Sequence, residues 1–205
     1  MRKRPLVTVL VSALMLLCVK AEASSPVRMR FGVDWGYSPQ LYQSFVSTYY
    51  TRIGYRVTEQ SRGFDYYSNG YLLFGLGCEI NNRCAFYLKS GYMGLFKDFR
   101  VMPILGEAQY FFSGGDSCDC PFIMLNGGIA LNSACFVDRT ILASLGGGYR
   151  HHLSRRTTLD MVARIQASNC SPQPNDKYDG LVPRDRIIFS NAHQFALSLG
   201  LSLYF

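Results

Sequence analysis

Two pairs of metal-binding residue types lie close together in the sequence. Cys118 and Cys120 flank Asp119, and His151 is followed by His152. Thiolate and imidazole groups hold zinc in proteins, so turns that brought the pairs together would offer four ligands. The spacing fits no standard zinc motif, however, and turns with free or locally bridged thiols account for the same residues. The sequence therefore indicates no metal site and no cofactor.

A histidine near the C-terminus is the strongest candidate for catalysis. His193 follows Ser190 and Asp185, and these residue types could supply a nucleophile and its base. His193 alternates in step with Phe195, which places it on an apolar face and not in a polar pocket. We therefore expect no catalytic residues and no enzyme activity. A lipid-modifying enzyme of the lipid A deacylase or acyltransferase type is the alternative function.

The elements that would position these side chains are strands. In FALSLGLSLYF, from Phe195 to Phe205, every second residue is large and apolar, and the residues between them are mostly small or polar. This alternation is typical of a strand with one apolar face. Similar segments of about ten residues, the length of a tilted membrane-spanning strand, recur along the chain. They begin near Arg28, Tyr71, Cys84, Ile104, Phe122, Ile141 and Leu159, which makes eight strands in all.

The first 23 residues have the organisation of an export signal. A basic start is followed by an apolar run too short to span a bilayer and by a small-x-small cleavage site, Ala21-Glu22-Ala23. Removing residues 1–23 takes away four basic residues and one acidic residue, so the formal charge falls from +7 to +4. The remaining chain, 24–205, is one mildly basic domain, and we expect no nucleic-acid partner.

The alternation is compatible with two barrel architectures. A closed barrel can cross a bilayer because closure pairs every backbone group. The apolar faces would then contact lipid, and the small and polar faces would fill a narrow lumen. A soluble periplasmic lipocalin-like ligand-binding barrel would instead turn the apolar faces inward. The many glycines and few charges of the opposite faces favour an all-β fold, an eight-stranded antiparallel up-and-down transmembrane β-barrel.

Charged residues on the polar faces come in both signs. An isolated charge in the lumen would cost on the order of several kcal/mol. We therefore expect these residues to pair as a ladder across the lumen, which would make the barrel a plug and not a pore. The ladder consists of Arg28, Arg30, Asp34, Glu79, Lys89, Glu107, Arg150, Asp160 and Arg164.

The connections alternate between short and long, as in barrels with short periplasmic turns and longer extracellular loops. With both termini in the periplasm, the short turns are 81–83, 113–121 and 151–156, and the two longest outer loops are 38–70 and 168–188. Tyr and Arg, which are enriched in binding hot spots, concentrate in the first outer loop. Part of this loop could also extend the strands or form an aromatic girdle. The candidate surface-recognition residues are Tyr49, Tyr50, Arg52, Tyr55, Arg56 and Arg62.

Export permits disulfides. Cys135 and Cys170 lie in two outer loops that can meet above the barrel, and they are the best candidates for a pair. Cys78 and Cys84 flank a turn. A three-residue turn would place these two diagonally, about 7–8 Å apart, too far to bridge without movement. The alternation favours that register and two unpaired thiols on the apolar face.

Three segments carry a resemblance to a known family: GYMGLFKDFRVMPILGEAQYFF, GGGYRHHLSRRTTLDM and the terminal LSLGLSLYF. The chain resembles the small outer-membrane β-barrel proteins of Gram-negative bacteria, with OmpA/OmpX-like architecture, in particular the single-domain barrels of the Bacteroidetes group. The resemblance implies that Phe205 is a signal for the barrel-assembly machinery. It also implies a monomer in the outer membrane in contact with lipid and lipopolysaccharide. The expected function is structural or surface-interacting through the outer loops, with an extracellular protein as a candidate partner.

Overall fold

The computed structural model describes residues 27–64, 66–80, 83–96, 99–113, 118–131, 140–178 and 180–205. Among these residues, no helix is long and apolar enough to cross a membrane. The predicted export signal, residues 1–23, lies outside the described residues. The strands are β1 (Arg28–Tyr37), β2 (Gln40–Tyr50), β3 (Arg56–Gly63), β4 (Gly70–Ile80), β5 (Cys84–Phe96), β6 (Phe99–Phe111), β7 (Cys120–Leu131), β8 (Thr140–His152), β9 (Thr158–Cys170), β10 (Asn175–Asp176), β11 (Gly180–Leu181) and β12 (Ile187–Tyr204).

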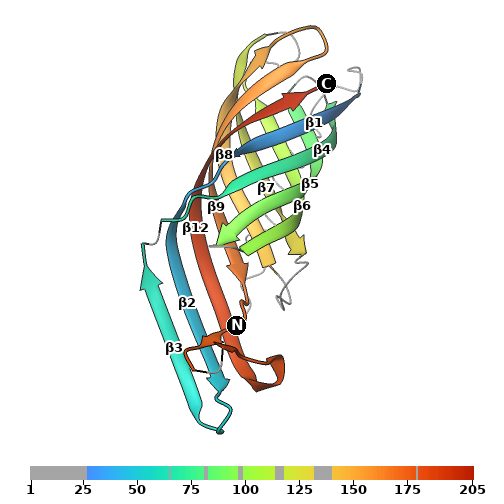
Figure 1. The fold of residues 1–205 in the computed structure, drawn as a ribbon. Coiled ribbons are helices and arrows are strands. Elements are labelled where there is room, and N and C mark those ends of the chain that lie inside the picture. The colour runs from blue at the N-terminus through green and yellow to red at the C-terminus, as the bar shows by residue number, and fades with distance from the viewer. Residues whose placement is uncertain are drawn as a thin grey trace, which may run out of the picture.

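Eight of these strands close into a barrel. They pair in the order β1-β4-β5-β6-β7-β8-β9-β12, and β12 returns to pair with β1. Each pair is antiparallel, and strands that follow one another around the barrel also do so along the chain once β2, β3, β10 and β11 are set aside (Figure 1). The predicted eight-stranded antiparallel up-and-down barrel is confirmed.

The apolar side chains of the barrel face outward. On β8, Leu145 is 63% exposed, whereas Arg150 on the same strand is fully buried. The same contrast holds on β4, where Leu76 is 62% exposed and Glu79 is buried. Because successive side chains of a strand point to opposite faces, the period-two pattern sends one set outward and the other into the lumen. The lipocalin-like alternative, which needs the apolar set inside, is therefore wrong.

The long first connection is mostly strand. After Ser38 and Pro39 the chain continues from β1 into β2, and both strands pair with the same edge of β12. The N–H of Leu197 donates to the carbonyl oxygen of Pro39 (3.2 Å), which joins the two stretches. β3 pairs with β2 and returns the chain to the barrel. We call β2, β3 and residues Ile187–Ala196 of β12 the projection; it extends beyond the barrel wall (Figure 1).

Some strands run further than the sequence predicts. β7 begins at Cys120 and β8 ends at His152, so the turns at this end are shorter than the predicted 113–121 and 151–156. The outer-loop prediction 168–188 is likewise shortened, because β9 ends at Cys170 and β12 begins at Ile187. Backbone pairing thus continues past the point where the apolar alternation stops, since pairing does not depend on the polarity of the side chains.

Candidate functional site

The part of the lumen nearest the C-terminus is organised around one arginine. Arg150 donates from Nε and Nη2 to the two carboxylate oxygens of Asp160 (2.8 and 2.9 Å) and from Nη1 to Glu79 (2.5 Å). Glu79 also accepts from Nε of Arg30 (3.1 Å). The guanidinium of Arg150 lies 4.2 Å from the ring centre of Phe111. The bidentate contact of Arg150 with Asp160, two parallel hydrogen bonds from one guanidinium to one carboxylate, is a strong way for arginine to bind a carboxylate.

A second group of charges lies in the lumen around Lys89. Its Nζ is 2.7 Å from Glu107 and 3.2 Å from Asp34. Arg164 approaches Asp34 at 3.6 Å and stacks over the ring of Tyr71 at 4.5 Å. Lys89 on β5 and Glu107 on β6 are diagonal neighbours on adjacent strands, whereas Asp34 lies on β1, two strands from β5, so Lys89 links three strands inside the barrel.

The lumen charges balance. Among the described residues, four basic and four acidic side chains lie inside the barrel, each at most 7% exposed and each within reach of a partner of opposite sign. Unpaired buried charge is strongly destabilising, so a balanced set is what a closed lumen requires. The eight residues are Arg30, Asp34, Glu79, Lys89, Glu107, Arg150, Asp160 and Arg164. The ninth predicted member, Arg28, differs: it is exposed at the start of β1.

Apolar side chains close the lumen on either side of the charges, which the sequence did not indicate. Around Tyr204 near the C-terminus, Tyr87, Phe111 and Phe122 are buried together. Toward the projection, a second cluster includes Leu73 and Leu105. The expected small and polar interior is therefore wrong near both ends of the barrel. Large apolar residues fill the lumen beside the ion pairs and make it a packed core.

The projection has an inner face that continues the lumen wall. Tyr49 lies on this face and is 1% exposed; its hydroxyl donates to Glu59 (3.1 Å). Burial, aided by the Glu59 carboxylate, raises the pKa of Tyr49 to about 12. The outer loop between β9 and β12 packs nearby, where Ser190 donates to the carbonyl oxygen of Pro172 (2.5 Å). Tyr49, predicted as a surface-recognition residue, is therefore a core residue of the projection.

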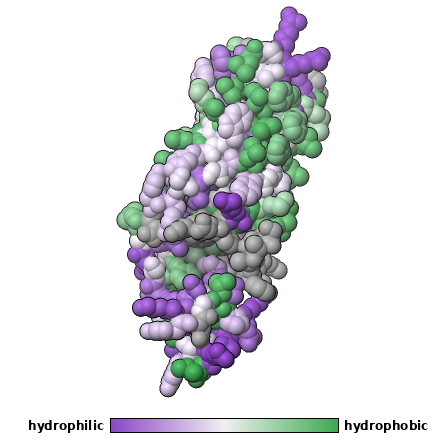
Figure 2. Space-filling model, in the orientation of Figure 1, coloured by the Kyte–Doolittle hydropathy of each residue, from purple (hydrophilic) through white to green (hydrophobic). Residues whose placement is uncertain are grey.

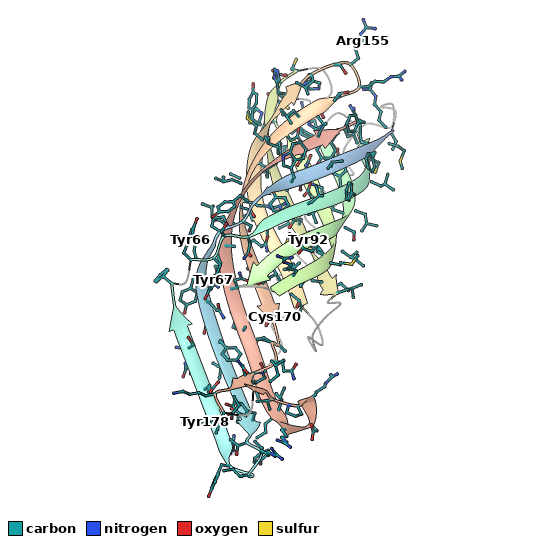
Figure 3. The ribbon with its side chains drawn as sticks, in the orientation of Figure 1. Tyr66, Tyr67, Tyr92, Arg155, Cys170 and Tyr178 are labelled. Atoms are coloured by element: carbon teal, nitrogen blue, oxygen red, sulfur yellow. The ribbon has the colours of Figure 1, made fainter. Side chains whose placement is uncertain are left out.

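The rest of the predicted recognition set lies on the surface. Arg56 is the first residue of β3 and pairs with Tyr50, the last residue of β2. Arg62 lies near the other end of β3. Figure 3 labels Tyr178 near the tip of the projection and Arg155 at the opposite end of the molecule. Hydrophobic surface gathers over the barrel and hydrophilic surface over much of the projection (Figure 2). The exposed members of the set are Tyr50, Arg52, Tyr55, Arg56 and Arg62.

An aromatic cluster marks the boundary between barrel and projection. Tyr42 contacts Phe64 (ring centres 5.5 Å apart) and Phe195 (6.4 Å). Tyr42 and Phe195 are paired across β2 and β12 on the outward face. Aromatic side chains are enriched at membrane–water interfaces. The predicted interfacial girdle and strand extension therefore both have counterparts in this segment.

At the other end of the barrel, one carboxylate joins two histidines. Asp119 Oδ2 is 2.5 Å from Nδ1 of His151, and Asp119 Oδ1 accepts from the backbone N–H of His152 (2.8 Å). The hydrogen bond from His152 lowers the pKa of Asp119. Among the described residues, no three His, Cys, Asp or Glu side chains are grouped as metal ligands. The contact joins the start of β7 to the end of β8.

The described cysteines are unbridged thiols. Cys84 is opposite Ile80 and Cys78 is opposite Phe86, so the two cysteines are diagonal neighbours, as the three-residue turn predicts. Cys170 is buried at the end of β9. Cys135 lies outside the described residues, so its pairing with Cys170 stays a prediction.

The last residue takes part in closing the barrel. The backbone N–H of Phe205 donates to the carbonyl oxygen of Phe31 (2.8 Å), and Phe31 donates back (3.2 Å). The Phe205 side chain is half-exposed on the outward face. Its role as an assembly signal stays a prediction.

A closed antiparallel barrel with apolar residues outside and paired charges inside has the fold of a small outer-membrane β-barrel. No family model and no curated protein matches the chain. Among solved structures, outer membrane protein OprG from Pseudomonas aeruginosa aligns with 12% identity over 86% of this chain and 95% of that one, with a TM-score of 0.53.

Two further solved barrels align with lower structural scores. Outer membrane protein AlkL has 14% identity over 90% of this chain and 94% of that one, with a TM-score of 0.48. Neisserial surface protein A has 16% identity over 87% and 98%, with a TM-score of 0.45. At these identities the likeness concerns the fold, and the OprG alignment carries it.

Proposed function

We propose that this chain is an outer-membrane barrel that does not conduct, with both termini in the periplasm and a structural or surface-interaction role exerted through its projection. The observation that carries the proposal is the contrast in charge between lumen and projection. In the described part of the chain, eight buried charges are paired inside the barrel, whereas exposed Arg and Tyr side chains occupy the projection. Pairing lets buried charges fill a closed lumen without the cost of unpaired charge, and exposed Tyr and Arg supply the residue types of binding hot spots.

Location in the outer membrane is tested by membrane fractionation together with gel mobility of boiled and unboiled samples. The expected result is recovery with the outer membrane and a mobility shift on boiling. Recovery as a soluble periplasmic protein without a shift would overturn the proposal.

Absence of conduction is tested in planar lipid bilayers. The purified barrel is expected to give no unitary current steps, because charged and apolar side chains fill the lumen. The matched variant is Lys89→Ala, which removes the side chain that joins Glu107 to Asp34. Regular current steps from the unaltered protein would contradict a plug.

The surface-interaction role is tested by replacing residues 43–62 with a short turn. The partner expected is an extracellular protein, detected as binding of the unaltered barrel to host or neighbouring-cell surface extracts that the shortened barrel lacks. A matched control replaces Arg155, exposed at the opposite end, with Gln. Equal binding by all three proteins would show that the projection takes no part in the interaction.

The alternative of a lipid-modifying enzyme receives less support from the geometry around His193. Ser190 pairs with Ser47 and shares the inner face, while His193 is exposed on the outer face. The two side chains of the proposed dyad therefore point to opposite sides of the sheet. Mass spectrometry of lipid A with and without expression tests this alternative, and an altered acyl pattern would support it.

A further inference from the structure

The apolar outward face of β12 has the height of a bilayer core. Outward residues alternate from Phe195 to Phe205, ten residue steps along the strand. At about 3.3 Å per residue this is about 33 Å of strand, and a tilt of about 40° reduces it to about 25 Å along the membrane normal. This equals the height of the apolar band of outer-membrane barrels. The aromatic cluster of Tyr42, Phe64 and Phe195 therefore marks the outer edge of the hydrocarbon.

The next row of outward side chains above this edge is polar or charged, not apolar. His193 of β12 is opposite Ser44 of β2, and Ser44 is opposite Arg62 of β3. Residues directly opposite one another share a face, so these three side chains form one row on the side of the sheet that faces lipid lower down. With adjacent strands about 4.8 Å apart, the outer two backbones are separated by about 10 Å. The hydroxyl of Ser44 lies between them.

We infer that this row, Arg62, Ser44 and His193, binds a phosphate group on a lipid headgroup of the outer leaflet, that of a phosphorylated glycolipid of the lipopolysaccharide type. Guanidinium binds phosphate through two parallel hydrogen bonds, and hydroxyl and imidazole groups add donors. The row lies directly above the hydrocarbon edge, where the phosphates of such a lipid are. The inference rests on the proposed function in that the barrel must span the membrane with its projection outside.

The surroundings of the row suit an anion. On the outward face of β2, β3 and Ile187–Ala196, all described, there is no carboxylate, because Glu59 lies on the opposite face with Tyr49. Asn191 Nδ2 lies 3.3 Å from Nε2 of His193. When Nε2 accepts this bond, the ring proton is on Nδ1, which then serves as a donor. Arg56 lies further out on the same face and adds a second positive charge.

Arg62 differs from Arg150 of the lumen in how the nitrogens of its guanidinium are used. Arg150 uses its nitrogens on Asp160, Glu79 and Gln109. Arg62 is exposed, and Gln60, with its amide turned to accept, lies 2.8 Å from its Nε and Nη2. Gln60 therefore holds the guanidinium through Nε and Nη2, and Nη1 takes no part in this contact. An oriented cation at fixed depth is what discrimination between headgroups requires.

The test measures lipid adducts on the purified, folded barrel by native mass spectrometry. The probes are hexa-acylated lipid A with two phosphates, the same lipid after dephosphorylation, and phosphatidylglycerol. The expected order of affinity places the phosphorylated lipid A first. The double variant Arg62→Gln/His193→Gln should bind it about tenfold more weakly, the scale of one lost charge-assisted hydrogen bond. Arg155→Gln, which removes one exposed charge at the opposite end, should leave binding unchanged.

Three results would overturn the inference. They are equal binding of lipid A with and without phosphate, equal binding of phosphatidylglycerol, and an equal loss in the Arg155→Gln control. Each leaves the proposed function standing if the barrel still fractionates with the outer membrane and shifts on boiling. Failure of that fractionation would instead overturn the proposed function itself. Because the substituted side chains of Arg62 and His193 are exposed, the variants should retain the boiled and unboiled gel shift, which is measured in parallel.

Discussion

The lumen and the projection use the same residue types in opposite ways. In the lumen, Arg150 is fully buried and held by Asp160 and Glu79. On the outward face of the projection, Arg56 and Arg62 are exposed, and no carboxylate of β2, β3 or Ile187–Ala196 shares that face. A buried guanidinium needs fixed partners, whereas an exposed one keeps its donors for ligands. The barrel charges are therefore paired within the fold, and the projection charges are the exposed ones on which the proposed recognition role rests.

Some charge pairs of the lumen join residues much further apart in sequence than the contacts within the β2–β3 hairpin. Arg150 and Glu79 are 71 residues apart in sequence, and Lys89 and Asp34 are 55 apart. Such pairs form only when distant strands have met, so they specify closure of the barrel. In the projection, Thr48 bonds to Thr58, ten residues away across a hairpin. The β2–β3 hairpin therefore closes locally, whereas the pairing of β2 with Ile187–Ala196 of β12 is long-range, like these lumen pairs.

The largest effect is expected from removing the central arginine of the lumen. Arg150→Met leaves the carboxylates of Asp160 and Glu79 without their main cation. Breaking a buried pair in this way costs about 3–5 kcal/mol. The free energy of unfolding, measured by urea titration of the barrel refolded in detergent, should fall by that amount.

The matched variant in the other region is Arg62→Met, which removes a charge from an exposed position. Exposed charges contribute about 0–1 kcal/mol. The urea midpoints of the Arg150→Met and Arg62→Met variants should therefore differ clearly. Equal midpoints would mean that the lumen is wet enough to screen its charges, and the contrast between the two regions would fail.

A smaller effect is expected from adding a methyl group to a glycine of the barrel wall. A Cβ at Gly128 on β7 would overlap the backbone carbonyl oxygen of Ile104 on the neighbouring strand. Because backbone cannot move aside as a side chain can, Gly128→Ala should destabilise the barrel by about 1–3 kcal/mol. Gly63 on β3 has open space around its Cβ position, so Gly63→Ala is the control. Thermal unfolding followed by circular dichroism compares the two; a larger loss in Gly63→Ala would contradict this account.

The barrel could be predicted from the sequence because the period-two alternation of apolar and polar residues decides it. Alternation with period two fixes which side chains point outward, and Phe74, Leu145 and Ile165 are all exposed as the pattern requires. The burial of the charged residues follows from the same parity. Their individual partners, such as Arg150 with Glu79, depend on which strands face one another across the lumen, and the pattern of one strand does not carry that information.

The projection was less predictable for a related reason. Outside the membrane both faces of a sheet can be polar, so the alternation that reveals a strand is weak there. β3, with the sequence RVTEQSRG, shows little of it. Tyr49 illustrates the consequence: its type indicates recognition, but the register of β2 turns it onto the inner face beneath the outer loop.

The projection is expected to be dispensable for the barrel. Replacing residues 43–62 with a short turn removes pairing partners of β12 but no lumen charge. The boiled and unboiled gel shift should persist, and the urea midpoint should change less than in Gly128→Ala. Loss of the folded gel band would show that the projection belongs to the fold and not to recognition.

The smallest effect concerns the contact between β7 and β8 at the end opposite the projection. The pKa of Asp119 is lowered in the folded chain, chiefly by the hydrogen bond from the His152 backbone. A lowered carboxyl pKa stabilises the fold above the unfolded value of about 4, and that contribution is lost as the pH falls through the folded value. Asp119→Asn should therefore make the turn 153–157 more susceptible to protease near neutral pH than it is in the unaltered protein. Toward strongly acidic pH the difference should vanish, as hydrogen exchange of the His152 amide would report. A difference that persists when Asp119 is protonated would mean that the side chain acts through shape and not through its charge.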